Sequence, residues 1–388
     1  LKRSRHPEPS GGRVGPVAME EQTWTSLEAC LVQVVNQEPI EPSPEVLQYD
    51  PRAEKMDVDG KAGQVLMWSD EQHKYIVETF DGDLVAIAEE NLKEYEVPPA
   101  DEGGFDTAFP SSDLRSDIFQ QQLADAILEK RYCVVQMSSK LSDRKTAIRS
   151  LQEVDSWARF MPEFEEVYMG HSAGGKRVQW LTEDYSDLES VGLTAMDQQL
   201  TSLAIAVCNV SAFFGFTGVC RSNAMLHMNC VNSDEEASLL QEVRGQVVGA
   251  GTIQSHLSFK HRRKICLMYF VHGSGGTLTL HPLDRGEDVT LSCHEGQVIA
   301  FRHDLCDYTF LPEAKQLALQ AWVFREQHSG ELSLTNPKLL DMDEQMEAIP
   351  RGPLYGDTGH SVDNMSLGAR LPGLVQNGVD YWTGLQVG

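Results

Sequence analysis

The sequence lacks several features that would assign it to particular protein classes. Its eight cysteines form no Cys-x-x-Cys pair, so structural zinc and a disulfide framework are not indicated and reduced thiols are favoured. No run of eighteen apolar residues occurs, and the most apolar stretch, 200–216, is interrupted by polar side chains. That stretch predicts a buried helix and no membrane span. Basic residues are scarce, since 32 Lys and Arg stand against 58 Asp and Glu, a net charge of −26. An acidic surface repels phosphates, which argues against nucleic-acid and anionic-membrane partners.

What the sequence does contain is enough to build cores. Hydrophobic residues make up 41% and aromatic residues 8% of the chain, which excludes wholesale disorder. The length of 388 residues predicts two to three domains at about 150 residues each. Because the chain begins at Leu1 and not at Met, we expect a piece of a longer protein, located in the cytoplasm or a plastid.

Shifts in composition divide the chain into five segments. Residues 1–48 are rich in Pro and Gly, with one amphipathic stretch at 20–35 that favours a helix, and they predict a disordered leader. Residues 50–97 hold short strands around a turn at Asp81 and Gly82, which predicts a small, strongly bent β-barrel. The other segments are a jelly-roll domain with N-terminal helices at 105–326, a linker at 327–360 and a truncated domain at 361–388.

The motifs of the second segment are similar to those of a known barrel type. Gly63-Gln64-Val65 is followed by Tyr75-x-Val77, the Asp81-Gly82 turn and a closing Glu-Asn-Leu. This order resembles the small barrels of the Src-homology type, which bind short peptides or space domains. No peptide groove is marked in the sequence, so we interpret this segment as a spacer.

The third segment places helices before strands. Helices are expected at 112–130, 144–160 and 195–216, and strands at 132–136, 264–271, 275–282, 289–293, 297–302 and 316–324. Regularly spaced strands after helices predict a helix-backed double-stranded β-helix, or jelly roll. The whole chain is therefore predicted to be α+β, with a small barrel, a jelly roll and the first strand and helix of a thiolase-like domain.

Motifs within the jelly roll are similar to those of a family of iron enzymes. Gly276–Pro282, the segment 296–301 some fifteen residues later and the closing segment 322–324 resemble iron(II)/2-oxoglutarate oxygenases of the prolyl-hydroxylase kind. The resemblance implies a facial triad of two histidines and a carboxylate, with a cation that pairs with 2-oxoglutarate. For the first histidine, the aspartate, the second histidine and the arginine of that pattern, the matching residues are His227, Asn229, Tyr308 and Gln316.

Three of these four positions depart from the family's pattern. A facial triad without two of its ligands rarely holds iron, so we expect a degenerate site with no cofactor. The alternative is a working oxygenase that uses iron(II) and 2-oxoglutarate.

A second metal arrangement is open nearby. His303, Asp304 and Asp307 lie within five residues of one another, and with His227 they form a candidate metal cluster. The other interpretation is a turn in which the aspartates accept backbone hydrogen bonds and the histidine packs or faces solvent. We favour the turn, because histidine–aspartate turns are common.

The end of the chain resembles the start of a type I polyketide ketosynthase. A Gly-x-Arg-x-Pro-Gly turn at 368–373 precedes Trp-x-x-Leu-x-x-Gly at 382–388. Upstream, 163–170 resembles an element found before the ketosynthases of dinoflagellate polyketide synthases. The resemblance implies that the chain is the N-terminal, non-condensing region of a β-ketoacyl synthase, whose complete form condenses acyl and malonyl thioesters with decarboxylation.

That family uses one cysteine to carry the acyl chain and two histidines to assist decarboxylation. We expect these residues beyond Gly388, so no catalytic residue is assigned within the chain. The implied partners are an acyl carrier protein and neighbouring synthase domains, in a homodimeric parent. A third hypothesis is a non-catalytic scaffold, in which the barrel and the jelly roll dock partner proteins.

Overall fold

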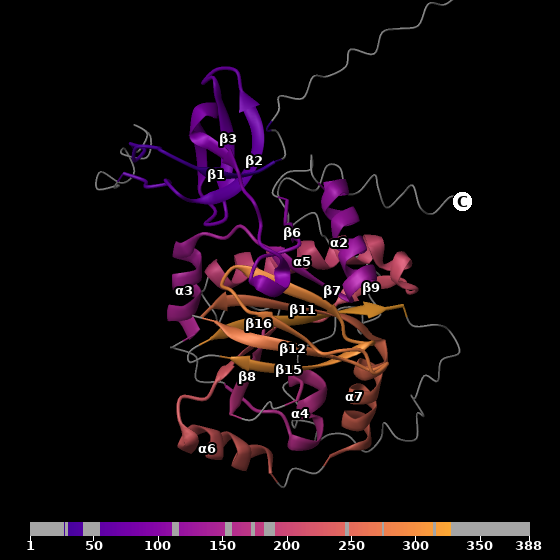
Figure 1. Ribbon diagram of the computed structural model, residues 1–388. Helices are drawn as coiled ribbons and strands as arrows, with labels where there is room; N and C mark the ends of the chain where they lie inside the picture. Colours follow the sequence, from indigo (N-terminus) through magenta and orange to yellow (C-terminus); the bar gives the residue numbers. More distant parts are fainter. Residues whose placement is uncertain are drawn as a thin grey trace, which may run out of the picture.

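The residues that the structure describes form an α+β fold with three largely antiparallel sheets, which confirms the expected class. Figure 1 shows this computed structural model, with the N-terminal sheet at one end and a larger unit of strands and helices below it. It describes residues 27, 30–41, 55–110, 116–151, 157–171, 175–181, 191–244, 248–273, 275–312 and 316–326. The predictions for the linker at 327–360 and the ketosynthase start at 361–388 lie outside these residues. Among the helices it describes, none has both the length and the apolar character needed to cross a bilayer.

The N-terminal unit is a five-stranded antiparallel sheet in the order β4-β3-β2-β1-β5. Its strands are β1 (Leu31–Val34), β2 (Ala62–Ser69), β3 (Lys74–Thr79), β4 (Leu84–Ile87) and β5 (Leu92–Glu94). In β3 every second residue is buried, so one face of the sheet encloses a core rich in valine. A bulge between Val65 and Met67 bends β2. The Asp81–Gly82 turn is confirmed, because it joins β3 to β4 and Gly82 has a φ of 78°.

This unit begins earlier in the chain than the sequence predicts. Residues 31–34, which the sequence analysis places in the disordered leader and in a helix at 20–35, form β1 instead. Val32 and Val34 are fully buried while their neighbours are not, which is the period of a strand and not of a helix. Because β1 pairs with both β2 and β5, it joins β5 to the rest of the sheet.

The larger unit winds between two facing sheets. The first is an eight-stranded sheet in the order β6-β7-β14-β11-β16-β10-β8, with β9 paired to β16, and the second has the order β13-β12-β15. From β11 onward the chain passes back and forth between the two sheets, with β12 and β13 forming a hairpin in the second, which is the winding expected of a double-stranded β-helix. The strands are β6 (Thr107–Ala108), β7 (Tyr132–Gln136), β8 (Lys176–Trp180), β9 (Gly218–Arg221), β10 (Met225–Asn229), β11 (Arg263–His272), β12 (Gly276–Pro282), β13 (Val289–Ser292), β14 (Gln297–Arg302), β15 (Cys306–Pro312) and β16 (Leu317–Arg325).

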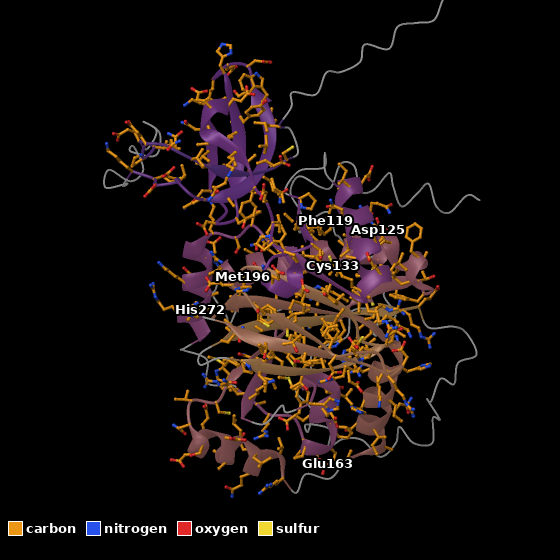
Figure 2. All side chains as sticks on the ribbon, viewed as in Figure 1. Phe119, Asp125, Cys133, Glu163, Met196 and His272 are labelled. Carbon is orange, nitrogen blue, oxygen red and sulfur yellow. The ribbon has the colours of Figure 1, made fainter. Side chains whose placement is uncertain are left out.

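Helices cover both sides of this pair of sheets (Figure 1). They are α2 (Ser116–Lys130), α3 (Leu141–Leu151), α4 (Pro162–Met169), α5 (Val191–Val210), α6 (Ser233–Val243) and α7 (Ala250–Arg262). Phe119 of α2 and Met196 of α5 pack with Cys133 of β7 in one core (Figure 2). A second core fills the space between the sheets and reaches α4 and α7. The central strand β11 faces both cores, which explains its nearly continuous apolar sequence.

Three helices of the larger unit were not predicted from the sequence. One is α6, which has a clear N-terminal signal, since the Asn232 side chain accepts hydrogen bonds from the backbone amides of Asp234 and Glu235. The others, α4 and α7, have short or weakly amphipathic sequences, so the hydrophobic period does not reveal them.

The two units pack against each other through aromatic side chains. The ring of Phe80, at the end of β3, meets that of Phe105 edge-on at a centroid distance of 5.5 Å. The Ser139 amide donates to the Phe80 carbonyl oxygen at 3.2 Å. At Gly82, an added Cβ would lie 2.8 Å from the backbone nitrogen of Lys140. The backbone of the β3–β4 hairpin therefore contacts the backbone of the jelly roll directly.

Candidate functional site

The histidine of the oxygenase-like pattern lies inside the jelly roll. His227 is on β10, between β8 and β16, and its side chain is buried. Its ring meets that of Phe310 edge-on at 5.6 Å, and its Nε2 atom has no hydrogen-bond partner among the residues that the structure describes. Burial, followed by the charge of Lys176, lowers the pKa of His227 to about 3. The imidazole is therefore neutral at physiological pH.

A lysine that sequence analysis did not identify lies beside this histidine. Lys176 begins β8, is only 2% exposed and donates to the carbonyl oxygen of Phe310 at 3.0 Å. Its ammonium group also lies 4.8 Å from the centroid of the Phe310 ring. Burial lowers the pKa of Lys176 to about 8, against an opposing effect of Glu165. The chain thus places a positive charge of its own near His227, which disfavours a metal cation there.

Tyr308 occupies the position of the second histidine, and its hydroxyl both donates and accepts a hydrogen bond. The hydroxyl of Tyr308, on β15, donates to the carbonyl oxygen of Tyr168 at 2.8 Å and accepts from Nε2 of Gln320 at 2.9 Å. Burial raises the pKa of Tyr308 well above its usual value, so the phenol stays protonated. The backbone of Gly170 lies directly against Tyr308. Any Cβ at this position would overlap the Tyr308 carbonyl oxygen, so only glycine allows Tyr308 to lie this close to the end of α4.

Aromatic rings occupy the space between the two sheets. Tyr168 of α4 stacks on Phe160 and Phe259 at centroid distances of 4.5 and 4.4 Å. The indole of Trp322, on β16, lies edge-on to Tyr168 and donates from Nε1 to Nδ1 of His303 at 2.9 Å. These contacts form a close-packed core.

The remaining candidate residues are dispersed. Asn229, half-buried at the end of β10, stands opposite Lys176 in the β8 register. The buried Gln316, where the family has an arginine, packs against Gly273 and Gly276 and supplies no positive charge. His303 is buried beneath Trp322.

The two aspartates of the second candidate cluster also point to different places. Asp304 accepts hydrogen bonds from the side chains of Arg302 and Lys264, and not from backbone amides. Asp307 is 45% exposed and lies near His171. The cluster of His303, Asp304 and Asp307 with His227 is therefore not assembled. Within the described ranges, no three His, Cys, Asp or Glu side chains are already arranged to hold a metal ion.

These residues do not fit iron(II) and 2-oxoglutarate. The first ligand position keeps its histidine, but the second has an amide and the third a hydrogen-bonded phenol. A neutral carboxamide stands where an arginine would pair with 2-oxoglutarate. A divalent ion would meet one imidazole and a buried ammonium group, and neither a carboxylate nor a second imidazole. No reaction step is therefore derived through iron here.

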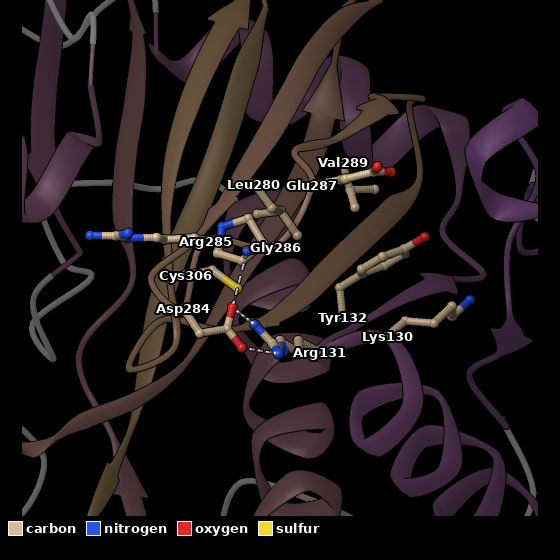
Figure 3. Close-up of a pocket in the computed structure, with 11 residues that line it drawn as sticks. Lys130, Arg131, Tyr132, Leu280, Asp284, Arg285, Gly286, Glu287, Val289 and Cys306 are labelled. Carbon is tan, nitrogen blue, oxygen red and sulfur yellow. Dashed lines mark hydrogen bonds and ion pairs between the residues drawn. The ribbon is translucent and has the colours of Figure 1, made fainter.

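A recess of about 320 Å³ lies at another end of the jelly roll, beside the loop that joins β12 to β13. In Figure 3, Arg131 and Asp284 face each other across two hydrogen bonds, of 2.8 and 2.6 Å. The hydrogen bond from Arg131 lowers the pKa of Asp284 to about 2. Cys306 is almost fully buried and its pKa is raised by burial, so its thiol is a poor nucleophile. None of the four motif positions lines this recess.

Comparison with known proteins gives a fold-level likeness only. No protein-family model matches the chain, and no curated protein matches it. A Trichoplax adhaerens prolyl hydroxylase, in complex with a hypoxia inducible factor peptide, is 11% identical with a TM-score of 0.40, over 55% of this chain and 91% of that one. A Pseudomonas putida prolyl-4-hydroxylase is 11% identical with a TM-score of 0.35, over 54% and 100%. A prolyl 4-hydroxylase from Phytophthora capsici is 16% identical with a TM-score of 0.36, over 62% and 77%.

Similarity at this level says nothing about activity. The strand order and winding define the jelly roll, and the side chains between its sheets determine the chemistry of the site.

Lys176 and Tyr168 are the residues of this site that sequence analysis missed. A signal for Lys176 was present, because strict alternation over 176–180 places it on the same buried face as Val178 and Trp180. No comparable signal exists for Tyr168, whose partner Tyr308 is 140 residues away.

Proposed function

We propose that this chain carries a non-catalytic jelly roll of oxygenase-like architecture, whose role is structural. The observation that supports this proposal is the hydrogen-bonded Tyr308, which closes the second histidine position onto Tyr168 and Gln320. The aromatic core around it leaves the fold stable without a cofactor. In this role the jelly roll holds the N-terminal sheet in a fixed orientation through the contact of Phe80 with Phe105.

The first test is turnover. When the purified chain is incubated with iron(II), 2-oxoglutarate and ascorbate, we expect no succinate above the protein-free background and no iron retained after dialysis, because two of the three ligand positions are changed and the cation for 2-oxoglutarate is absent. Succinate is measured by chromatography and iron by elemental analysis. A prolyl hydroxylase assayed in parallel is the positive control.

One result would reverse this conclusion. If succinate forms, and both succinate and retained iron disappear in His227→Ala, the chain is an active oxygenase. Iron that persists in His227→Ala is bound elsewhere and does not support oxygenase activity.

The second test addresses the joint between the two units. Phe80→Ala and Phe105→Ala, made singly and together, are expected to show a coupling free energy of about 1 kcal/mol in urea unfolding, because edge-on aromatic pairs contribute about 0.5–1.5 kcal/mol beyond their buried area. A matched cycle of Phe105 with Leu84, which is 64% exposed on β4, is expected to give a coupling near zero. Additive Phe80 and Phe105 effects would mean that the units are not held together by this contact.

The ketosynthase context stays a prediction. Its support is the sequence alone, in the motifs at 368–373 and 382–388. Under this hypothesis, translation of the reading frame beyond Gly388 yields a cysteine and two histidines in ketosynthase order, and an acyl carrier protein is the partner. A continuation without them removes the synthase hypothesis and leaves the proposal of a non-catalytic jelly roll untouched.

A further inference from the structure

Two histidines and an aspartate lie together on the outer face of the three-stranded sheet β13-β12-β15. His281 of β12 is directly opposite Asp307 of β15. Two residues along β15, on the same face, Thr309 forms a parallel bridge with His171, which follows α4. The imidazole rings of His171 and His281 are 5.9 Å apart, centroid to centroid. Residues from three separate segments thus converge on one patch of the surface.

Each imidazole has a carboxylate at its Nδ1 atom. His171 Nδ1 is paired with Oε1 of Glu166, and His281 Nδ1 lies 3.0 Å from Oδ2 of Asp288. A carboxylate at Nδ1 holds the proton on that nitrogen and leaves the lone pair on Nε2. Histidines that bind metals have this kind of outer partner, which fixes the tautomer and the ring orientation.

Both Nε2 atoms face oxygen atoms of β15. His281 Nε2 is 2.8 Å from Oγ1 of Thr309, and His171 Nε2 is 3.9 Å from Oδ2 of Asp307. With its proton on Nδ1, His281 accepts this hydrogen bond from the threonine hydroxyl. The lone pairs of the two imidazoles are therefore directed at the same strand, two residues apart.

We propose that His171, His281 and Asp307 bind a divalent zinc ion on the outer face of this sheet. Zinc accepts imidazole nitrogen and carboxylate oxygen at about 2.0–2.2 Å, and two imidazoles on one tetrahedral ion have ring centroids about 5 Å apart. The separation of 5.9 Å therefore has to shorten by only about 1 Å. The fourth position is left to a water molecule or to the hydroxyl of Thr309.

The side chains have the freedom to make this adjustment. His171 and Asp307 are 43% and 45% exposed, and His281 is 31% exposed, so the three side chains lie at the surface, where a small change in χ angle moves few packed atoms and keeps the carboxylate partners at Nδ1 within reach. Three carboxylates surround the patch, those of Glu166, Asp288 and Asp307. Together with the net charge of −26, they favour a cation at this surface.

This site is distinct from the interior position of the oxygenase-like pattern. On β12 and β15 the side chains of Leu280, Tyr308 and Phe310 are buried between the sheets, whereas those of His281 and Asp307 alternate with them and point outward. Zinc here and iron inside would therefore depend on different residues.

The experiment is a calorimetric titration of the full chain, stripped with EDTA, with zinc chloride. We expect one ion per chain with a dissociation constant in the micromolar range or below, and a loss of at least tenfold in affinity in His171→Ala and in His281→Ala. His272→Ala is the matched control, because His272 is 42% exposed and pairs with Glu295 at 3.1 Å. Its affinity for zinc is expected to equal that of the unchanged chain.

Two further measurements separate a lost site from a lost fold. Without zinc, each variant is expected to melt at the temperature of the unchanged chain, and zinc is expected to raise that temperature only when all three ligands are present. Cobalt(II) in place of zinc is expected to give visible absorption bands that vanish in Asp307→Asn. Absence of binding, or binding equal in all variants, overturns the proposal. The result is independent of oxygenase turnover, which is tested through His227.

Discussion

Replacing Trp322 with alanine is expected to lower the free energy of unfolding of the jelly roll by about 4–5 kcal/mol. The indole is fully buried, and truncation of buried aromatic side chains costs about 3–5 kcal/mol. It also meets Phe259 edge-on at 5.0 Å and donates to His303 Nδ1. Removal of that donor leaves a buried nitrogen without its partner, at about 1 kcal/mol or more.

Denaturation with guanidinium chloride, followed by near-ultraviolet circular dichroism, measures this loss. Leu311→Ala on β15 is the control, because Leu311 is 54% exposed and such positions change stability by about 0.5 kcal/mol or less. A loss below about 2 kcal/mol for Trp322→Ala would show that the space between the sheets is not the closed core described above.

The second prediction is a gain in stability. Lys176→Met is expected to raise the free energy of unfolding at pH 7 by about 2 kcal/mol. A pKa lowered from 10.5 to about 8 corresponds to a cost of about 3 kcal/mol for keeping the buried ammonium charged. Loss of the hydrogen bond to the Phe310 carbonyl oxygen removes about 1 kcal/mol of this gain.

The pH dependence of the stability gain in Lys176→Met tests whether the buried charge of Lys176 is its cause. Because the pKa of Lys176 is lower in the folded protein than in the unfolded chain, the unfolded state binds more protons between pH 8 and 10.5. The stability of the unchanged protein therefore rises across that window, and the advantage of Lys176→Met disappears near its upper end.

Urea unfolding at several pH values between 7 and about 10.5 measures both effects, with Lys93→Met on the exposed edge of β5 as the control. A loss of stability in Lys176→Met at pH 7 would contradict the prediction. It would mean that the carbonyl oxygen and the ring of Phe310 outweigh the cost of burial.

The sequence predicted six strands of the jelly roll and missed five, namely β6, β8, β9, β10 and β15. The strand expected at 264–271 is observed at Arg263–His272, and the one expected at 297–302 has those bounds. Both are apolar runs bounded by turns, where the hydrophobic pattern is strongest. Of the four positions that the oxygenase-like motif assigned, His227, Tyr308 and Gln316 are buried and Asn229 is partly buried.

What the sequence did not reveal depends on contacts between distant segments. The N-terminal sheet needs β1 from residues expected to be a leader, because its pairing partners lie about thirty and sixty residues further along. The basic residues at 260–264 end α7 and begin β11. Arg262 and Arg263 are buried there against the rings of Phe324 and Phe259, and a charge pattern alone does not predict such stacking.

The hairpin at Gly82 has a consequence for how this protein can change. Since a Cβ at Gly82 would press on the Lys140 backbone, and a φ of 78° also strains any other residue, substitution here acts on the junction and not on either core. Gly82→Ala would thus weaken the packing of the N-terminal sheet against the jelly roll, while each unit keeps its own fold.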